Sequence, residues 1–330
     1  MILTQDNYYS TEADMEYMSC SQYQGFLECE AKQLAKLQKR WVDEPSQAFL
    51  VGNFFHSYFE GEEAHAKFKR ENLDIFTKSS VKNYESALEA KAFQIVIGGK
   101  TNINPEGELE LLSPFKQALK MIEVAEKDPL IKQFIDMQGE NEIFMTGYIG
   151  ETKFKIKMDK YIRDTRFIID YKTVANIWET SYNPVKQVRQ TFVEMYGYVL
   201  RAAVYSLIEV QNALGMTFDE AYTQLKNGEL DLPQFFLICV SKQDYPDKAV
   251  LHVNHEQQYI AEIEGMFKNL YRFNMIKEGR QLPKRCNTCD YCRATKILKA
   301  VIPYYQLMPE FREGREDDYA AKSMAETLQA

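Results

Sequence analysis

The chain has 330 residues, of which 45% are hydrophobic and 27% charged, and its formal net charge is −8. This composition is sufficient for one large globular domain, and no apolar run is long enough to span a membrane. The first residues lack a basic segment followed by an apolar one, so we expect no secretory signal and a cytoplasmic location.

The negative net charge would exclude nucleic acid as a partner only if the charges were evenly distributed. Ten Lys or Arg residues accompany six Asp or Glu residues between Glu151 and Arg201, and nine accompany two between Met266 and Lys299. Local basic patches govern contact with phosphate. Each of these cations could equally serve only to solvate an exposed face, so the composition leaves nucleic acid open as a partner.

The hydrophobic pattern predicts an α/β protein. Helices are expected where apolar residues recur every three or four positions, and strands where they alternate or form short runs. In chain order we expect helices at about residues 19–40 and 46–69, a strand at 91–97, a helix at 113–127, strands at 141–149, 153–162 and 167–173, a helix at 183–207, strands at 235–240 and 250–253, and a helix at 255–277. Residues 1–310 are expected to form a single domain, and residues 311–330 a flexible charged tail.

Two of the predicted strands carry charged side chains at matching positions. Asp170 and Lys172 are two residues apart and therefore point to the same side of their strand. A tight turn at residues 163–166 would pair this strand antiparallel with the preceding one and bring Asp159 close to Asp170. Two carboxylates and a lysine would then converge, as a hard divalent cation and a water nucleophile require. We interpret the three residues as a candidate catalytic metal site.

The spacing of these residues resembles the D-Xn-(D/E)-X-K signature of the PD-(D/E)XK nuclease superfamily, because ten residues separate Asp159 from Asp170-Tyr171-Lys172. The resemblance implies a restriction-endonuclease-like fold with a mixed central sheet flanked by helices. It also implies that Asp159, Asp170 and the carbonyl of Tyr171 bind Mg²⁺ or Mn²⁺. Lys172 would then orient water and stabilise the transition state.

Two more residues fit patterns of this superfamily. Gly52 and His56 form a G-X-X-X-H motif that is found in RecB-type members, whose histidine contributes to the metal site. The competing interpretation of His56 is a hydrogen-bonded histidine on an aromatic helix. Glu142 opens the strand before Asp159 and resembles the third acidic ligand of the family, although an exposed carboxylate at a strand edge fits the sequence as well.

Four further blocks are similar to the phage RecE-type, or exonuclease VIII-like, nucleases. These are residues 18–23, 26–30, 240–247 and 286–293, and the resemblance spans about residues 17–298. It implies an exonuclease that binds the ends of double-stranded DNA and degrades one strand, 5′ to 3′. The single strands would serve an annealing recombinase. A homo-oligomeric ring, a phage or prophage origin and a bacterial host cytoplasm are further implications.

One position departs from the RecB-type pattern. Those nucleases carry Q-X-X-X-Y on the helix after the lysine strand, whereas here Arg201 replaces the glutamine and Tyr205 is retained. Arginine can still contact phosphate through two hydrogen bonds, but it accepts none. Gln190 or Gln187 could replace the missing glutamine. We therefore expect Arg201, Tyr205 and Gln190, together with Lys157, to contact DNA.

Three of the six cysteines have the C-X2-C-X2-C spacing that indicates a metal site in a chain without a secretory signal: Cys286, Cys289 and Cys292. A fourth thiolate must come from elsewhere in the chain. Cys29 is the candidate by resemblance to iron–sulfur nucleases that join their N-terminal region to a C-terminal cysteine cluster, and Cys20 is the alternative. We expect a structural [4Fe–4S] cluster, with zinc or no metal as alternatives, and a buried core thiol at Cys239.

Two other functions remain compatible with the sequence. A catalytically weakened nuclease scaffold could act as a DNA-binding or protein-binding module, because Arg201 departs from the active-site pattern. An endonuclease or nickase could use the same catalytic residues. No complete phosphate-binding loop is present, so the chain lacks a nucleotide-hydrolysing motor.

Overall fold

The computed structural model describes residues 3–96, 107, 109–183, 187–298, 301, 303 and 304, without the side chains of residues 93–96. The chain forms two compact units, Met1–Arg285 and Cys286–Ala330. The predicted tail, residues 311–330, lies outside the described residues, and the single domain over residues 1–310 stays a prediction. Within the described part of the chain, no helix combines the length and the apolar character needed to cross a membrane.

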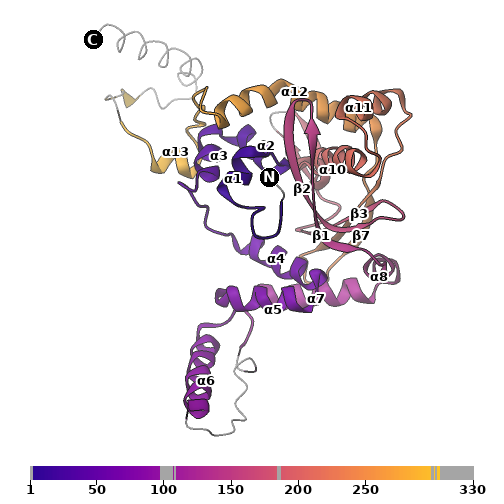
Figure 1. The fold of residues 1–330 in the computed structure, drawn as a ribbon. Helices are drawn as coiled ribbons and strands as arrows, with labels where there is room; N and C mark the ends of the chain where they lie inside the picture. The colour runs from indigo at the N-terminus through magenta and orange to yellow at the C-terminus, as the bar shows by residue number, and fades with distance from the viewer. Residues whose placement is uncertain are drawn as a thin grey trace. The chain divides into compact units, whose positions relative to one another are not determined.

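A mixed five-stranded sheet forms the centre of the first unit (Figure 1). Its strands lie in the order β1-β2-β3-β6-β7, and only the β3–β6 pair is parallel. Their bounds are β1 (Glu140–Ile149), β2 (Thr152–Ile162), β3 (Phe167–Val174), β6 (Gln234–Ser241) and β7 (Lys248–His252). The predicted α/β class with a mixed sheet flanked by helices is confirmed. A separate hairpin pairs β4 (Thr180–Asn183) with β5 (Val188–Thr191).

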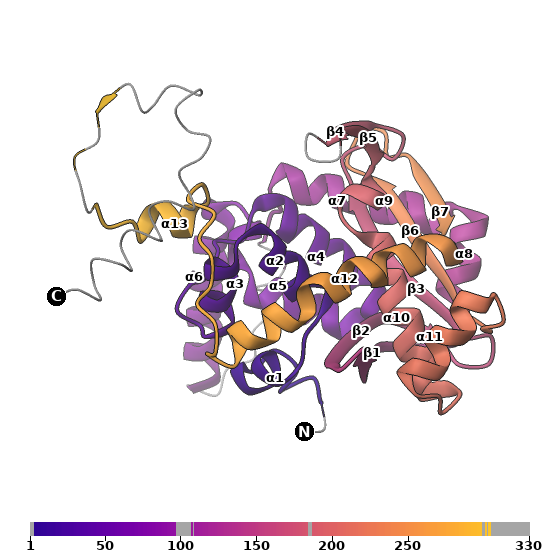
Figure 2. The same ribbon diagram turned by 90° about the horizontal axis from the view of Figure 1, so that it is seen from above.

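Helices cover both faces of the sheet (Figure 2). One face packs against α2 (Cys20–Glu28), α3 (Glu30–Leu37), α10 (Tyr198–Ala213), α11 (Phe218–Asn227) and α12 (Glu256–Lys277). The other packs against α4 (Gln47–Glu60), α7 (Ser113–Lys127) and α8 (Pro129–Asp136). The remaining helices of this unit are α1 (Thr11–Glu16), α5 (Glu62–Glu71), the 3-10 helix η1 (Leu73–Ile75), α6 (Lys78–Val96) and α9 (Phe192–Met195). In the second unit, α13 spans Asp290–Ala294.

The alternation of β3 divides the apolar core into two clusters. Ile168 belongs to the larger cluster, beside α10 and α12, whereas Ile169 and Tyr171 belong to the smaller one, beside α4 and α7. Asp170 and Lys172 share the parity of Ile168 and therefore point toward the side of α10. The strand thus presents Asp170 and Lys172, together with Ile168, to the side of α10, and Ile169 and Tyr171 to the side of α4 and α7.

A buried ion pair holds the turn between β2 and β3. The Arg166 guanidinium donates hydrogen bonds to both carboxylate oxygens of Glu209 in α10, at 2.9 and 2.5 Å. Glu209 has no exposed surface and also accepts a 2.6 Å hydrogen bond from the Tyr161 hydroxyl. Arg166 has a φ of +53°, a conformation that few non-glycine residues adopt. These contacts fix the two strands relative to α10.

Two predicted helices are interrupted. The expected helix at 19–40 is α2 followed by α3, with extended backbone at Cys29 (φ −162°) between them. The expected helix at 46–69 is α4 followed by α5, and it breaks at Gly61, whose φ of +135° is incompatible with a continuing helix. The resulting shorter helices pack against different parts of the core.

Two other predictions of secondary structure were wrong. Residues 91–96 belong to the long helix α6, which extends away from the sheet, and do not form a strand (Figure 1). The expected helix at 183–207 is replaced by the β4–β5 hairpin, α9 and the start of α10. A capping box between Thr191 and Glu194 begins a new helix at Phe192, and Gly197 in the left-handed conformation separates it from α10.

Lys277, at the end of α12, is a buried cation that is 8% exposed. Its Nζ donates hydrogen bonds to the Tyr17 carbonyl at 2.8 Å and to Gln22 Oε1 at 3.3 Å. Burial lowers the pKa of the Lys277 amine to about 7; Asp14 opposes this effect and Lys155 adds to it. An unfolded lysine has a pKa of about 10.4, so the unfolded chain binds more protons than the folded one between these two values.

We expect the free energy of unfolding to gain roughly 2–3 kcal/mol from Lys277 between about pH 7.5 and about pH 9.5, because each unit of pKa difference corresponds to about 1.4 kcal/mol. Lys277→Met should remove this gain, and Lys268→Met, an exposed position on the same helix, should retain it. Urea unfolding at both pH values measures the difference. Parallel pH profiles for wild type and Lys277→Met would contradict the assignment.

Candidate active site

The candidate site lies where β2 and β3 separate. The two strands pair only over residues 160–162 and 167–169, next to their turn. Beyond this point, the backbone N–H of Tyr171 donates a 2.9 Å hydrogen bond to Asp159 Oδ2 instead of to a carbonyl of β2. Farther along β2, Met18 exchanges two backbone hydrogen bonds of 2.8 Å with the strand. The gap between the two strands therefore holds the carboxylate of Asp159.

Lys172 brings the three predicted catalytic residues together. Its Nζ forms an ion pair with Asp170 and lies 3.8 Å from Asp159 Oδ2. The same Nζ donates a 2.9 Å hydrogen bond to the Tyr171 carbonyl. The side chain of Asp170 is only 2% exposed, so its charge depends on cationic neighbours rather than on water. The structure thus brings Asp159, Asp170 and Lys172 together, as the sequence predicted.

Helix α4 places His56 beside Asp159. The Phe59 ring stacks on Tyr171 of β3 with ring centroids 4.9 Å apart, which docks the helix against the strand. His56 Nε2 lies 2.6 Å from Asp159 Oδ2, and Nδ1 lies 2.8 Å from Glu60 Oε1. Burial lowers the pKa of the His56 imidazole, but the two carboxylates outweigh it and raise the pKa to about 9. Without a bound metal, His56 is therefore protonated at neutral pH.

The carboxyl group of Asp159 is held in its ionised form. Burial raises its pKa, but the charges of His56 and Lys172 and the hydrogen bonds from His56 and the Tyr171 N–H together hold the pKa well below its usual range. The carboxylate of Asp159 therefore carries its negative charge without needing a metal cation to ionise it.

Glu142 has an unusual backbone conformation directly opposite Asp159. Asn141 pairs with Lys160 and Ile143 with Met158, which places Glu142 in register with Asp159, and its φ is +59°. Both carboxylate oxygens are buried, and among the described residues neither has a hydrogen-bond partner, although Lys157 forms a close ion pair with the group. A left-handed glutamate inside a strand costs conformational energy, and such strain clusters at functional sites.

The predicted DNA-contacting residues have different surroundings. Arg201 Nη1 lies 3.3 Å from Asp170 Oδ1, and the proximity of Asp170 raises the pKa of its guanidinium against the effect of burial. The Tyr205 hydroxyl donates a 3.0 Å hydrogen bond to the carbonyl of Lys157. Gln190 in β5 is buried and accepts a hydrogen bond from Asn183. Their roles in DNA binding stay predictions.

Two neighbours of the site were missed by the sequence reasoning. Glu60 contacts His56, and its signal was the spacing of four residues on one helix face. The Tyr198 ring lies beside both the Lys172 Nζ and the Arg201 guanidinium, with centroid distances of 5.7 and 5.5 Å. Tyr198 lies three residues before Arg201 on α10, a spacing that indicates this contact, whereas its contact with Lys172 depends on how the helix packs against β3.

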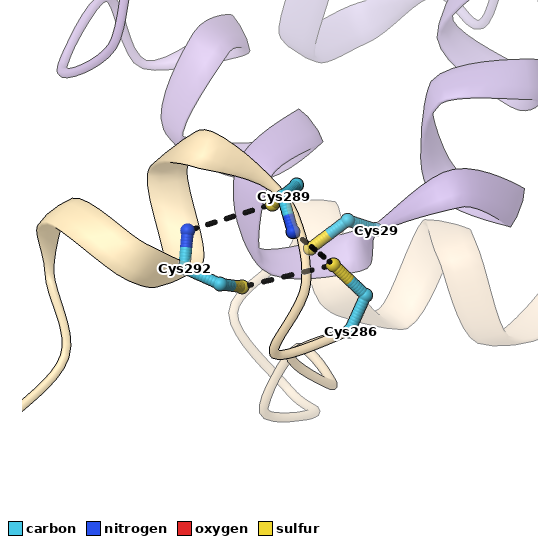
Figure 3. Close-up of side chains that lie close together, drawn as sticks. All are labelled: Cys29, Cys286, Cys289 and Cys292. Atoms are coloured by element: carbon cyan, nitrogen blue, oxygen red, sulfur yellow. Dashed lines mark hydrogen bonds between the residues drawn. The ribbon is translucent and has the colours of Figure 1, made fainter.

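The second unit contains the cysteine motif (Figure 3). The Sγ atoms of Cys286 and Cys292 are 3.9 Å apart, and the backbone N–H groups of Cys289 and Cys292 point at the sulfurs of Cys286 and Cys289. Burial raises the pKa of the Cys286 thiol, but hydrogen bonds from Thr288 and Cys289 outweigh it and lower the pKa to about 6. Cys286 is therefore favoured as a thiolate, which is the form of cysteine that binds metal.

The other candidate thiols lie in the first unit. Cys20 and Cys239 belong to the larger apolar core, and burial raises the pKa of each to about 12. Cys239 is thus the buried core thiol that was expected. Cys29 is the N-cap residue of α3 and is also buried. Figure 3 draws it with the three cysteines of the motif.

The donor groups around the gap suit a hard divalent cation. Asp159, Asp170 and the Tyr171 carbonyl place oxygen atoms at this gap, and Glu142 adds a buried carboxylate whose Oε1 has no hydrogen-bond partner among the described residues. His56, Glu60 and Glu142 could also hold a metal ion. Oxygen-rich sets of this kind bind Mg²⁺ or Mn²⁺.

A comparison with models of protein families shows which family the chain belongs to. Residues 19–295 match the model described as a PDDEXK-like domain of unknown function (DUF3799). The chain belongs to this family. No protein with a curated description matches it.

The PDDEXK-like fold is also found in a solved structure. A protein from Eubacterium rectale called “Putative exonuclease” is 32% identical, with a TM-score of 0.73 over 94% of this chain and 99% of that one. Another structure, SSO0001, is 13% identical over 85% of this chain and 97% of that one, with a TM-score of only 0.24. Family and neighbour together support a nuclease.

We expect the His56 imidazole of the metal-free PDDEXK-like domain to titrate near pH 9. The stabilisation from its charge is complete below about pH 6.5 and is lost as the pH rises through 9. Asp159→Asn should lower this pKa, because it removes the neighbouring charge. NMR titration measures it, with His56→Gln to assign the signal. The signal of His65, whose pKa burial lowers to about 4, is the internal reference, and an unchanged His56 titration in Asp159→Asn would contradict the interpretation.

Proposed function

We propose that this protein is a divalent-metal-dependent exodeoxyribonuclease that acts on the ends of linear double-stranded DNA. The observation that carries the proposal is the convergence of Asp159, Asp170, Lys172 and the Tyr171 carbonyl at the gap between β2 and β3. Phosphodiester hydrolysis needs this combination of oxygen ligands and a fixed cation. Membership in the PDDEXK-like family supports the same chemistry.

The proposed metal ligands are Asp159, Asp170, Glu142, the Tyr171 carbonyl and His56 in its neutral form. Mg²⁺ or Mn²⁺ bound there would polarise the scissile phosphate and lower the pKa of a bound water. Support for Glu142 comes from its strained backbone and from its buried carboxylate, whose Oε2 pairs with Lys157 and whose Oε1 has no hydrogen-bond partner among the described residues. His56 must lose a proton to become a ligand, so its carboxylate neighbours make binding pH-dependent.

The cations of the site have separate proposed roles. Lys172 hydrogen-bonds the attacking water and neutralises the charge that develops on the phosphate, since its Nζ is already fixed by the Tyr171 carbonyl. Arg201 leaves Asp170 to contact a phosphate oxygen, with Tyr198 beneath its guanidinium. Lys157, Tyr205 and Gln190 are proposed to contact DNA as well, and the Tyr205 hydroxyl is held beside the strand that carries Asp159 by its hydrogen bond to the Lys157 carbonyl.

The resemblance to RecE-type nucleases supports a more detailed proposal for the polarity, partner and assembly of the enzyme. The enzyme would degrade one strand 5′ to 3′ and pass the remaining single strand to an annealing recombinase. It would act as a homo-oligomeric ring in a bacterial cell, encoded by a phage or prophage. A strand-specific substrate labelled at either the 5′ or the 3′ end distinguishes the two polarities.

A specific contact favours the alternative of a weakened scaffold. Arg201 and Lys172 together contact both carboxylate oxygens of Asp170 in the metal-free protein. Each carboxylate oxygen has a further lone pair for a metal cation, but a site in which both positive charges stay would repel the metal and bind it weakly. Such a protein would still bind DNA through its cations but would release no nucleotides.

We expect the purified protein to release nucleotides from labelled linear duplex DNA with Mg²⁺ or Mn²⁺ and to stop when EDTA is added. Asp170→Ala and Lys172→Ala should each lower the rate on the order of 10²–10³-fold or more, since each removes a preorganised charge from the reacting centre. The matched controls are Asp136→Ala and Lys132→Ala, an exposed ion pair on α8.

Three results of this assay would decide against the proposal. Undiminished degradation by Asp170→Ala and Lys172→Ala would exclude these residues as the catalytic centre. Binding of DNA without any nucleotide release by the wild type would favour the scaffold. Cleavage of covalently closed circular DNA would favour an endonuclease or nickase.

We propose further that Cys29, Cys286, Cys289 and Cys292 bind one structural metal centre, a [4Fe–4S] cluster in preference to zinc. Support for Cys29 comes from contacts within Met1–Arg285. The Ala31 N–H donates to the Lys284 carbonyl at 3.0 Å, and the Lys284 N–H donates to Glu30 at 2.6 Å. Lys284, near the end of the first unit, therefore lies beside the two residues that follow Cys29.

We expect anaerobically purified protein to absorb visible light near 400 nm and to contain iron and acid-labile sulfide. Cys29→Ser and Cys286→Ser should lose the metal and lower the unfolding temperature, because the centre closes a long loop of the chain. Cys239→Ala should keep the metal. A colourless protein with one zinc ion per chain would show that the bound metal is zinc. A protein that contains no metal would contradict the proposed metal centre.

A further inference from the structure

Glu60 is the last residue of α4 and lies against the candidate metal ligand His56. The His56 ring sits between two carboxylates, with Nε2 2.6 Å from Asp159 and Nδ1 2.8 Å from Glu60. The side chains of His56 and Glu60 are each 22% exposed, so water competes only partly for these contacts. Each ring nitrogen thus has its own carboxylate partner.

The position of Glu60 is unfavourable for the helix itself. The C-terminus of a helix carries partial negative charge, so an acidic side chain there is destabilising. The helix ends at once, because Gly61 has a φ of +135°. The Glu60 carbonyl also accepts a 3.1 Å hydrogen bond from the Asn141 side chain, which fixes the end of α4 to the strand residue next to Glu142. The carboxylate of Glu60 is therefore held at one defined point beside His56, although its charge destabilises the helix.

A carboxylate at this position can control which nitrogen of the His56 imidazole carries the proton. A histidine binds metal through a nitrogen that carries no proton, so its remaining proton must be on the other nitrogen. A carboxylate that accepts the hydrogen bond from this second N–H fixes the tautomer, orients the ring and raises its basicity. Glu60 meets Nδ1, which leaves Nε2 on the side of Asp159.

We propose that Glu60 is a positioning residue that holds His56 with Nδ1 protonated and Nε2 directed at the metal cation. This inference rests on the proposed function, because it concerns the same site. Glu60 acts through His56 and does not itself bind the cation. A direct role would be the competing arrangement, since His56, Glu60 and Glu142 can offer three ligand atoms within 4.8 Å of one another.

The test compares Glu60→Ala and Glu60→Gln with wild type in the absence of DNA. Mn²⁺ titration gives the dissociation constant and the number of ions bound, and ¹⁵N NMR of the Mg²⁺-loaded protein reports the Nδ1 proton of His56. Glu63→Gln is the matched control, because it removes an exposed charge three residues away. Circular dichroism confirms that each variant is folded.

We expect Glu60→Ala to bind Mn²⁺ about 10–100-fold more weakly and to lose the protected Nδ1 proton signal. Glu60→Gln should recover part of the affinity and retain the signal, because its amide oxygen still accepts the hydrogen bond. Glu63→Gln should behave as wild type. Unchanged affinity and an unchanged Nδ1 signal in Glu60→Ala would overturn the proposal, as would the loss of one of two bound ions with the affinity of the other intact.

These readouts separate the two proposals. Wild-type protein that binds Mn²⁺ with the expected Glu60 dependence but degrades no DNA would overturn the nuclease and leave the role of Glu60 standing. Degradation of DNA by a Glu60→Ala protein with wild-type Mn²⁺ affinity would overturn only the role of Glu60. Wild-type protein that binds no Mn²⁺ would overturn both.

Discussion

The separation of β2 from β3 is the constraint on which the candidate site depends. Two antiparallel strands that stayed paired would satisfy their backbone groups with each other and leave no room between them. Here the ladder stops after three pairs, and the Tyr171 N–H finds the carboxylate of Asp159 as its acceptor. The hydrogen bond from the Tyr171 N–H therefore spans the gap between the strands and also orients the carboxylate of Asp159. The Arg166–Glu209 ion pair fixes the turn from which the strands diverge.

The gap holds a balanced set of charges. Among the described residues, four carboxylates contact four cationic groups: Glu60, Glu142, Asp159 and Asp170 against His56, Lys157, Lys172 and Arg201. Charges with little access to water need such partners, because their desolvation is otherwise costly. In the proposed function, a divalent cation that displaces the His56 proton leaves the set with a net positive charge. A phosphodiester, which is anionic, would then complete the balance.

Local sequence signals explain which elements were predicted well. The strands with alternating apolar residues and the helix opened by Ser113-Pro114 lie where they were expected, because burial and local backbone preference favour the same structure there. The helix expected at 183–207 failed because its apolar spacing is also compatible with a hairpin followed by two helices. The capping box at Thr191 was a usable signal for this break, whereas the extended conformation of Cys29 depends on its surroundings.

The sequence by itself determined the spacing of Asp159, Asp170 and Lys172, the parity that places the last two on one side of β3, and the cysteine motif. These properties follow from covalent neighbours and from the period of a strand. Only the tertiary structure decided that His56 meets Asp159, that Glu142 takes a left-handed conformation opposite Asp159, and that Arg201 contacts Asp170. Each of these features depends on how far β2 separates from β3 or on how α4 and α10 pack against the sheet. No local pattern specifies those distances, because they result from the packing of segments that are far apart in the chain.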